Sequence, residues 1–311
     1  ASGNVSADNK YIGGLVGQVS SGSDCAREFV DFGIACRSGT QVRGYAPISD
    51  AHATGDVNTT YDGDGNGDAH VGGLIGGMEG ARQLTNLSAS GEVTSASGDR
   101  VGGLIGNVNH ADGNYGITNA SATGNVSTTG QRVGGLIGRY FGGGSVETSY
   151  ARGNVSTSGN YVGGLIGSTS EPITDSYARG DVNSSGDAVG GLVGSTTGDV
   201  TRTYASGRVK GGGSSVGGIV GSNGGTLSDA YWDKGATNQT TATGSGTPPG
   251  ATGYGTVGDT RALEMQGRAP TQFMSALNYT SPWKLTSTYP IVQRESATSG
   301  SLPATVDAGE A

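Results

Sequence analysis

The hexapeptide VGGLIG occupies Val133–Gly138, and close copies of it recur along the whole chain. The seven copies begin at Ile12, Val71, Val101, Val133, Val162, Val189 and Val216. Their successive starts lie 59, 30, 32, 29, 27 and 27 residues apart. A fixed unit at this spacing predicts a repeat architecture instead of one thick globular core. The first spacing is about twice the others, which predicts that one copy has been lost or overwritten there.

A second motif lies between the hexapeptides and carries three aligned columns of small apolar residues. In the copy ETSYARGNVS at 147–156, the column residues are Ala151, Gly153 and Val155. Side chains two positions apart lie on the same face of a β-strand, so all three are expected to face inward. The alanines of this column are Ala53, Ala89, Ala122, Ala151, Ala178 and Ala205.

These two motifs together predict an all-β fold, a β-solenoid (β-helix) of about seven to eight coils. One copy of short strands cannot bury its own apolar face, whereas stacked copies bury each other's. Successive coils would lie ~4.8 Å apart. Glycine is needed where the backbone turns with positive φ or where a facing backbone leaves no room for a side chain. In VGGLIG the valine is expected to face the core with the leucine, the isoleucine or both.

The paired motifs resemble the GLUG repeat, which is named for its Gly-Leu-apolar-Gly core. This repeat occurs in bacterial and archaeal surface proteins, including large adhesins and the non-catalytic parts of immunoglobulin A peptidases. The resemblance covers residues 1–237. It implies an extracellular or cell-surface protein, and it implies nothing catalytic.

The C-terminal part of the chain departs from the repeat and is expected to cap the stack. Trp232 stands where the other copies carry alanine, and a large flat side chain there would close the core. Residues 262–278 show helical periodicity, and residues 282–292 end in a strand-like run. The expected organisation is a solenoid at 1–237, a cap segment at 238–293 and a polar tail at 294–311. Within the solenoid we expect a cysteine-containing insertion at 20–48 and an Asp/Gly-rich loop at 61–70.

The first residues, ASGNVS at 1–6, match the end of the second motif, so the sequence begins inside a coil. Three interpretations remain open: a fragment trimmed from a longer protein, a natural end covered by another copy of the same protein, or a tolerated open edge. The second would make the protein its own end-to-end partner, because an open sheet edge invites further pairing.

Composition narrows the range of partners. The 26 acidic and 18 basic side chains give a net charge of −8, and no basic stripe is present to neutralise phosphates, so we expect no nucleic-acid partner. Arginine far outnumbers lysine among the bases, a bias compatible with a salt-adapted source. We also expect no transmembrane segment, since no apolar run reaches the length a spanning helix needs.

Two kinds of covalent feature fit an extracellular setting. The two cysteines, Cys25 and Cys36, are expected to form a disulfide, with two separate thiols as the alternative. Nine Asn-x-Ser/Thr sequons are candidates for glycosylation, and several arise because the repeat itself contains GNVS. They are Asn4, Asn58, Asn86, Asn119, Asn125, Asn154, Asn183, Asn238 and Asn278.

The stretch DGDGNGD at 62–68 resembles the opening of a calcium loop. Its oxygen ligands would be Asp62, Asp64, Asn66 and Asp68, and calcium is the only cofactor we consider. The twelfth position is Gly73 where an EF-hand requires glutamate, so a complete EF-hand is excluded. The alternative is a solvated turn, which the same residues favour.

A column of tyrosines precedes the alanine column in the later copies, at Tyr150, Tyr177, Tyr204 and Tyr231. Two interpretations are open. The rings stack for structural reasons with their hydroxyls in water, which we favour, or they bind the faces of sugars. Arg152 and Arg179 follow two of these tyrosines. They would stack as like charges, either exposed to solvent or holding an acidic glycan.

Catalytic motifs find little support, so we expect no enzyme. The chain has three histidines and no HExxH, and GSSVG at 213–217 lacks the strand–helix context of a nucleophile elbow. The leading interpretation is an extracellular, non-enzymatic surface protein, adhesin-like or stalk-forming, with a glycan or cell-surface ligand as its partner. The first alternative is a self-assembling subunit of a surface filament. The second is a carbohydrate-active enzyme, for which no convincing acid pair is evident.

Overall fold

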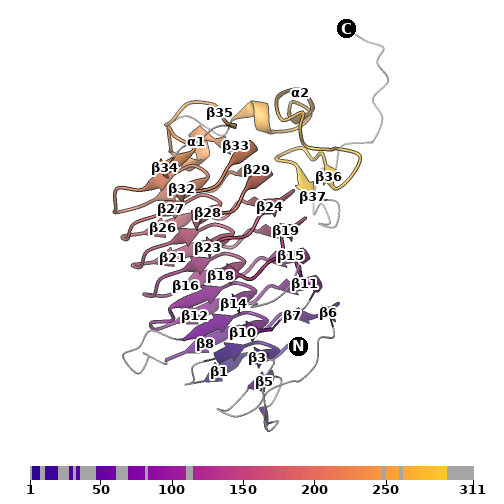
Figure 1. Cartoon of the computed structure of the whole chain (residues 1–311), viewed down its shortest axis with the longest axis vertical. Coiled ribbons are helices and arrows are strands. Elements are labelled where there is room, and N and C mark those ends of the chain that lie inside the picture. The colour runs from indigo at the N-terminus through magenta and orange to yellow at the C-terminus, as the bar shows by residue number, and fades with distance from the viewer. Residues whose placement is uncertain are drawn as a thin grey trace.

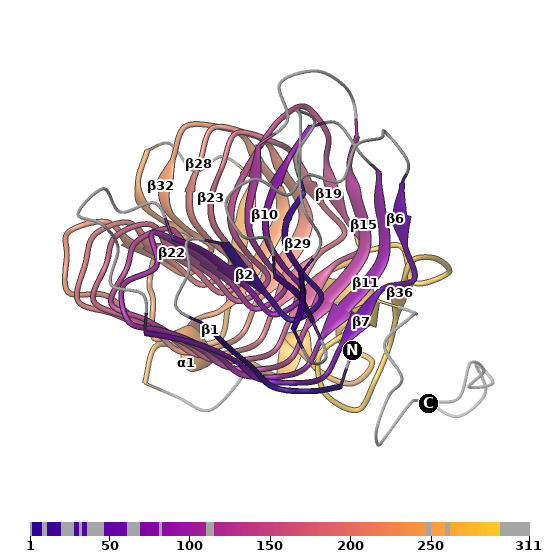
Figure 2. The ribbon, with the colours of Figure 1, turned by 90° about the horizontal axis from the view of Figure 1, so that it is seen from below.

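The structure is a computed structural model that describes residues 2–7, 11–19, 28–30, 33–35, 47–60, 69–80, 83–109, 115–246, 250–258 and 262–292. These residues form a β-solenoid in which the chain winds through four sheets, and successive coils pair in parallel within each sheet (Figure 1). Each coil adds one short strand to a sheet, except in sheet 4, where some coils add two. Viewed along the stack, successive coils superpose on one another (Figure 2). The predicted all-β solenoid is therefore confirmed.

Sheets 1 and 2 each contain seven strands in chain order. Sheet 1 consists of β1 (Val5–Ala7), β8 (Val57–Thr59), β12 (Val93–Ser95), β16 (Val126–Ser127), β21 (Val155–Thr157), β26 (Val182–Ser184) and β30 (Val209–Lys210). Sheet 2 consists of β2 (Tyr11–Gly13), β9 (His70–Gly72), β13 (Arg100–Gly102), β17 (Val133–Gly134), β22 (Val162–Gly163), β27 (Val189–Gly190) and β31 (Val216–Gly217). The valine columns of the two motifs thus lie in the strands of both sheets, with Ile12 in place of valine in β2.

Sheets 3 and 4 are longer and accept strands from outside the regular repeat. Sheet 3 consists of β3 (Val16–Val19), β4 (Glu28–Val30), β5 (Gly33–Ala35), β10 (Ile75–Glu79), β14 (Ile105–Asn109), β18 (Ile137–Phe141), β23 (Ile166–Thr169), β28 (Val193–Thr196), β32 (Val220–Asn223) and β34 (Thr243–Ser245). Sheet 4 consists of β6 (Ile48–Ser49), β7 (His52–Ala53), β11 (Leu84–Ala89), β15 (Ile117–Ala122), β19 (Val146–Glu147), β20 (Tyr150–Ala151), β24 (Ile173–Thr174), β25 (Tyr177–Ala178), β29 (Val200–Ala205), β33 (Leu227–Asp233) and β35 (Ala251–Tyr254).

Register between coils follows the sequence columns. Val133 pairs with Val162, Ile137 pairs with Ile166, and Ala151 pairs with Ala178. Each coil therefore places the same side chain directly above its counterpart, and the apolar columns are continuous along the stack. This regularity is the reason that a 27-residue spacing in the sequence becomes a single step in space.

The core answers the question of which hexapeptide residues point inward. Leu136 and Ile137 are both fully buried, and so is Val133. The leucine and isoleucine columns pack with the alanine column in one apolar cluster, while the valines of sheets 1 and 2 form a second one. The solenoid thus has two narrow apolar columns that run side by side.

Glycine separates these two columns because the walls come too close for side chains. A Cβ added to Gly135 would lie 2.1 Å from the Gly164 carbonyl oxygen and 3.0 Å from the Ala151 Cβ. A Cβ on Gly134 would lie 2.0 Å from the Ile137 carbonyl oxygen. Both distances to oxygen are far inside van der Waals contact, so neither position accepts alanine without a backbone shift.

The number of complete coils is smaller than expected. Five consecutive coils between Leu84 and Asn223 contribute to all four sheets. The coil before them, from Ile48 to Glu79, contains residues 61–68, which lie outside the described part. The remaining described strands belong to partial coils, so the solenoid has about five complete turns against the seven to eight expected.

The long first spacing does not reflect a lost coil, which corrects the sequence prediction. Ile12 pairs directly with Val71, so the first two hexapeptides lie on adjacent coils. Between them, the described strands β5 and β4 add to the edge of sheet 3, where β5 pairs with β3 in parallel and β4 pairs with β5 antiparallel.

The last part of the chain lies along the side of the stack as well as over its end. It contains α1 (Lys234–Thr237), the short 3-10 turn Leu263–Met265, α2 (Pro270–Phe273), β36 (Trp283–Lys284) and β37 (Ile291–Val292). Figure 1 shows β36 and β37 beside β24 and β29. The helical pattern at 262–278 corresponds to two isolated turns, because the chain bends between them. The strand predicted at the end of residues 282–292 is confirmed as β37.

Candidate functional site

The tyrosine column stacks as predicted, but the Tyr204 hydroxyl is bonded inside the protein instead of lying in water. The rings of Tyr150, Tyr177 and Tyr204 are parallel, with centroids 5.2 and 4.9 Å apart. Tyr177 and Tyr204 are fully buried, and the Tyr204 hydroxyl donates a 2.6 Å hydrogen bond to the Pro290 carbonyl. Burial also raises the pKa of Tyr204. The C-terminal segment covers this face, so these two rings are not available to a sugar.

Two buried carboxylates hold the C-terminal segment on the stack, and the sequence analysis missed both. Asp175 accepts a 2.9 Å hydrogen bond from the Trp283 indole and a bidentate pair from Arg202. Asp233 is fully buried and accepts from the Ala262 amide and the Tyr289 hydroxyl. The only sequence signal was the position of Asp233 directly after Trp232.

Trp232 lies in the register position that the repeat predicts. It pairs with Ala205, is almost fully buried, and its ring fills the space above Gly218. The indole Nε1 donates to the Gln239 carbonyl, so the one polar atom of the ring is satisfied. A bulky side chain thus fills the core position that alanine holds in the other coils.

Arg152 and Arg179 differ in their surroundings. Arg152 is exposed, whereas Arg179 is half-buried. The Arg179 guanidinium lies 5.2 Å from the centre of the Tyr289 ring, and its Nη2 atom donates a long 3.4 Å hydrogen bond to Thr288. Arg179 therefore contributes to docking the C-terminal segment, which is a structural role rather than the acidic-glycan contact considered above.

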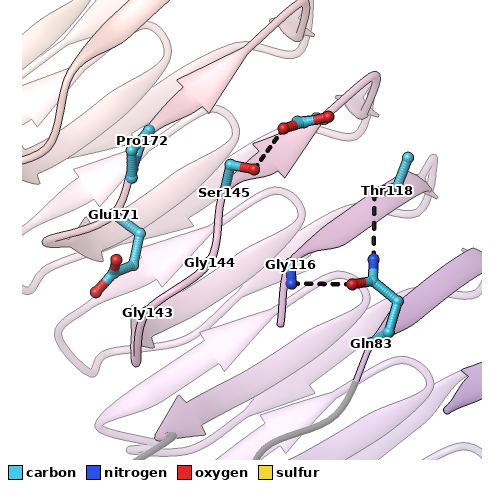
Figure 3. Close-up of a pocket in the computed structure, with 9 residues that line it drawn as sticks. Gln83, Gly116, Thr118, Gly143, Gly144, Ser145, Glu171 and Pro172 are labelled. Atoms are coloured by element: carbon cyan, nitrogen blue, oxygen red, sulfur yellow. Dashed lines mark hydrogen bonds between the residues drawn. The ribbon is translucent and has the colours of Figure 1, made fainter. Parts of the chain in front are cut away.

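A polar pocket of about 530 Å³ opens on the surface where sheet 3 turns into sheet 4 (Figure 3). It spans several coils, because its walls come from the residues that lead into β11, β15, β19 and β24. The lining residues are Gln83, Gly116, Thr118, Gly143, Gly144, Ser145, Glu147, Glu171 and Pro172.

The pocket walls are fixed by hydrogen bonds between coils and within one coil. The Gln83 side chain accepts from the Gly116 amide at 3.2 Å and donates to the Thr118 hydroxyl at 3.4 Å. Glu171 accepts from the Gly142 amide at 3.0 Å, and Ser145 donates to Glu147 at 2.5 Å. These bonds orient amide and carboxylate groups before any ligand arrives.

The chain can form this turn because glycine occupies its strained positions. Gly142 and Gly143 have φ of 143° and 85°, and a Cβ on Gly144 would lie 2.3 Å from the Tyr115 carbonyl oxygen. The FGGGS run at 141–145 was the sequence signal for an irregular turn at this place.

The pocket is lined by groups that form hydrogen bonds. Its two carboxylates, Glu147 and Glu171, accept from Ser145 and from the Gly142 amide. Its walls carry amide, hydroxyl and carboxylate groups, which bind hydroxyl-rich or cationic ligands. The pocket has the size range of small-molecule sites, although it is more polar than most.

The predicted disulfide and calcium site cannot be placed on the described part of the structure. Cys25 and Cys36 of the disulfide, and the calcium candidates Asp62, Asp64, Asn66 and Asp68, all lie outside the described residues. Within the part that the structure describes, no group of three His, Cys, Asp or Glu residues is placed to hold a metal ion. Among those same residues, no helix is both long and apolar enough to cross a membrane.

The nine sequons are all described, and they differ in exposure. Asn4, Asn58, Asn125, Asn154, Asn183, Asn238 and Asn278 are exposed, whereas Asn86 and Asn119 are half-buried. The two half-buried residues have φ of 63° and 57° and lie in the bend of sheet 4.

The comparisons with known proteins agree with this architecture. The chain carries the GLUG motif, whose family model matches residues 129–156, so the resemblance seen in the sequence is confirmed. The chain is also 74% identical over 270 residues to a protein named halomucin from Haloquadratum walsbyi (strain DSM 16790 / HBSQ001). The matched region covers 86% of this chain and 3% of the relative, so the chain spans a small part of that protein's length. No solved structure matches the chain.

Proposed function

We propose that this chain is a non-enzymatic β-solenoid module of an extracellular surface protein, serving as a stiff, stalk-like spacer with adhesin-like ligand contacts. The observation that carries the proposal is the strict coil-on-coil register, which continues one apolar core through five coils. The name of the relative, halomucin, supports a place at the cell surface, and its far greater length supports a modular role.

The spacer role follows from the hydrogen bonding. Each described coil is bonded to its neighbours through parallel ladders in four sheets, so bending the rod would strain bonds on all sides at once. The solvent-facing positions of sheet 1 alternate strictly with the buried valines, as in the exposed, buried and exposed sequence of Asn154, Val155 and Ser156. A net charge of −8 keeps such rods soluble and apart.

The adhesin-like role is assigned to the pocket between Gln83 and Glu171. Its preset amide, hydroxyl and carboxylate groups suit the hydroxyls of a glycan on a neighbouring surface. We favour ligand binding over a carbohydrate-active enzyme because hydrogen bonds from Ser145 and from the Gly142 amide already engage the two carboxylates of the pocket, Glu147 and Glu171.

The boundaries expected from the sequence are part of this proposal. Residues 1–237 would form the solenoid, with the insertion at 20–48 and the loop at 61–70, residues 238–293 the cap segment, and residues 294–311 a tail. Trp232 supports a change of architecture near this boundary, because its ring occupies the core position of the alanine column, while β34 and β35 still add one strand each to sheets 3 and 4. A disulfide between Cys25 and Cys36 and a calcium clip at 62–68 remain proposals for the N-terminal half.

Self-assembly into a filament is the second candidate. Among the described strands, β1, β2 and β6 stand at the ends of their sheets, and edges of this kind can pair with another chain. Electron microscopy and sedimentation of the purified chain separate the candidates. Single short rods support the spacer, whereas long fibres would support the filament and reject the monomeric spacer.

Ligand binding is tested on a glycan array with the intact chain and two variants. We expect Glu147→Gln to weaken binding, because it removes a carboxylate acceptor from the pocket wall. The matched control is Glu79→Gln, an exposed glutamate on β10 that does not line the pocket. Equal binding by all three proteins would reject the pocket as the binding site, and binding by none would reject the adhesin-like role while leaving the spacer role to microscopy.

A further inference from the structure

Five of the nine sequons lie on the outer surface of sheet 1. In each, the asparagine and the hydroxyl residue two positions later are both exposed, because they flank an inward-facing residue of the strand. Asn125 and Ser127 flank Val126, and Asn154 and Ser156 flank Val155. The five asparagines are Asn4, Asn58, Asn125, Asn154 and Asn183.

A hydrogen-bond ladder orients three of these side chains. The Oδ1 atoms of Asn4, Asn125 and Asn154 accept 2.9 Å bonds from the backbone amides of Asp56, Asn154 and Asp181 on the next coil. Because Oδ1 points to the neighbouring coil, the Nδ2 atom of each side-chain amide points away from that bond, and Nδ2 is the atom that N-linked glycosylation modifies. For Asn125 it donates to Glu92 at 3.1 Å.

Attachment of a sugar at Nδ2 is compatible with every bond of this ladder. A glycosylated asparagine keeps its Oδ1 acceptor and one N–H, so the bond to the next coil and one donated bond both survive. These asparagines can therefore be glycosylated without breaking their hydrogen bonds to the next coil.

At the two half-buried sequons, neither the asparagine nor its hydroxyl residue is fully exposed to solvent. Asn86 and Asn119 lie in left-handed conformation inside the bend of sheet 4, and their hydroxyl partners Ser88 and Ser121 are also half-buried. The Asn86 Nδ2 donates to Asp50 of the adjacent coil. A bulky glycan there would meet the neighbouring strands.

From this contrast we infer that sheet 1 is the glycan-bearing face of the solenoid, with N-linked oligosaccharides on its exposed sequons and none on Asn86 or Asn119. In the transfer, Nδ2 bonds to the anomeric carbon of a lipid-phosphate-activated oligosaccharide. The bond from that carbon to the phosphate oxygen breaks, the lipid phosphate leaves, and one amide proton is lost to a base. This inference rests on the proposed extracellular location, since such transfer occurs outside the cytoplasm.

The test is peptide mass mapping of the full chain, secreted from a host that glycosylates Asn-x-Ser/Thr sequons. We expect glycopeptides at Asn58, Asn125, Asn154 and Asn183, with the peptides of Asn86 and Asn119 unmodified. Equal modification of Asn86 and Asn119 would overturn the inference, because the folded face would then not select the sites. Secreted protein without any glycan on sheet 1 would also overturn it, whereas retention inside the cell would instead reject the proposed location.

A matched pair of variants separates the sequon from the ladder. Ser156→Ala removes the sequon of Asn154 but leaves its bond to Asp181, so it should abolish that glycopeptide without lowering thermal stability. Asn160→Gln changes an exposed asparagine that makes the same kind of bond, to the Asp187 amide, but belongs to no sequon. It should leave the glycan pattern unchanged, and loss of the Asn154 glycan in this control would overturn the inference.

Discussion

Replacing Asp233 by alanine should release the C-terminal segment from the side of the solenoid. The carboxylate is fully buried and accepts hydrogen bonds from the Ala236 amide at 2.8 Å, the Ala262 amide at 2.6 Å and the Tyr289 hydroxyl at 2.5 Å. The Ala262 and Tyr289 donors are buried and would lose their acceptor. A buried donor left unsatisfied costs about 1–3 kcal/mol, so the substitution should destabilise docking by about 2–6 kcal/mol.

The assay follows denaturant unfolding with two probes. The chain has two tryptophans, so in a Trp232→Phe background Trp283 alone reports on the C-terminal segment, while far-ultraviolet circular dichroism reports on the coils. In the Asp233→Ala variant the Trp283 transition should move to lower denaturant than the coil transition. The control is Asp199→Ala, an exposed carboxylate that accepts from the Thr226 amide and that water can replace.

The reasoning fails if the two probes still coincide and the free energy of unfolding falls by less than about 1 kcal/mol, the scale of an ordinary exposed substitution. It also fails if Asp199→Ala has the same effect as Asp233→Ala. The first result would mean that the apolar contacts of Met265, Met274 and Trp283 suffice to hold the segment in place, and the second that burial of the Asp233 carboxylate does not set the size of the effect.

Three further predictions concern the core, the buried tyrosines and the undescribed loop. Leu165→Ala should lower the free energy of unfolding by about 2–5 kcal/mol in chemical denaturation, because a fully buried leucine leaves a cavity, whereas Leu263→Ala, at a 78% exposed side chain, should stay within about 0.5 kcal/mol. Burial raises the pKa of Tyr231 to about 12 from an ordinary value of 10.0, so its contribution to stability should be complete below pH 10 and be lost as the pH rises towards 12. Denaturant midpoints measured between neutral and alkaline pH check this, and a flat profile would contradict it. Calcium should raise the thermal midpoint of the wild-type chain but not of Asp64→Ala, and no effect of calcium on either protein would reject the clip.

The sequence predicted the repeating part of the fold because identical residues recur at every coil. The valine, alanine and glycine columns each reappear as a straight line of stacked residues, so period 2 within a copy and period 27 between copies together set both face and register. The hexapeptide could not reveal that leucine and isoleucine are both buried, since adjacent residues of a regular strand point to opposite faces. The chain escapes that rule because β18 begins at Ile137, directly after the turn that holds Leu136.

Features without a repeat could not be predicted in this way. Trp283 and Asp175 are 108 residues apart, and no periodic signal connects a tail segment with a coil it will cover. The bend of sheet 4 was missed although it had a sequence signal. Its left-handed column is Asp50, Asn86, Asn119, Thr148, Asp175, Arg202 and Asp229, and five of these seven are Asn or Asp, the types that adopt positive φ most readily after glycine. The pocket depends on how the turns of different coils align, which the FGGGS run alone does not determine.

The register of the coils also has a mechanical consequence. A coil of 27 residues adds only ~4.8 Å to the length of the rod, but the same residues drawn out straight span roughly 90 Å. Because each coil is held mainly by its immediate neighbours, a pull along the chain would peel coils from an end one at a time. Each release would lengthen the tether many-fold and dissipate the work of breaking one layer of bonds. Under tension such a rod unfolds coil by coil from an end, absorbs energy at each step, and keeps the inner coils folded.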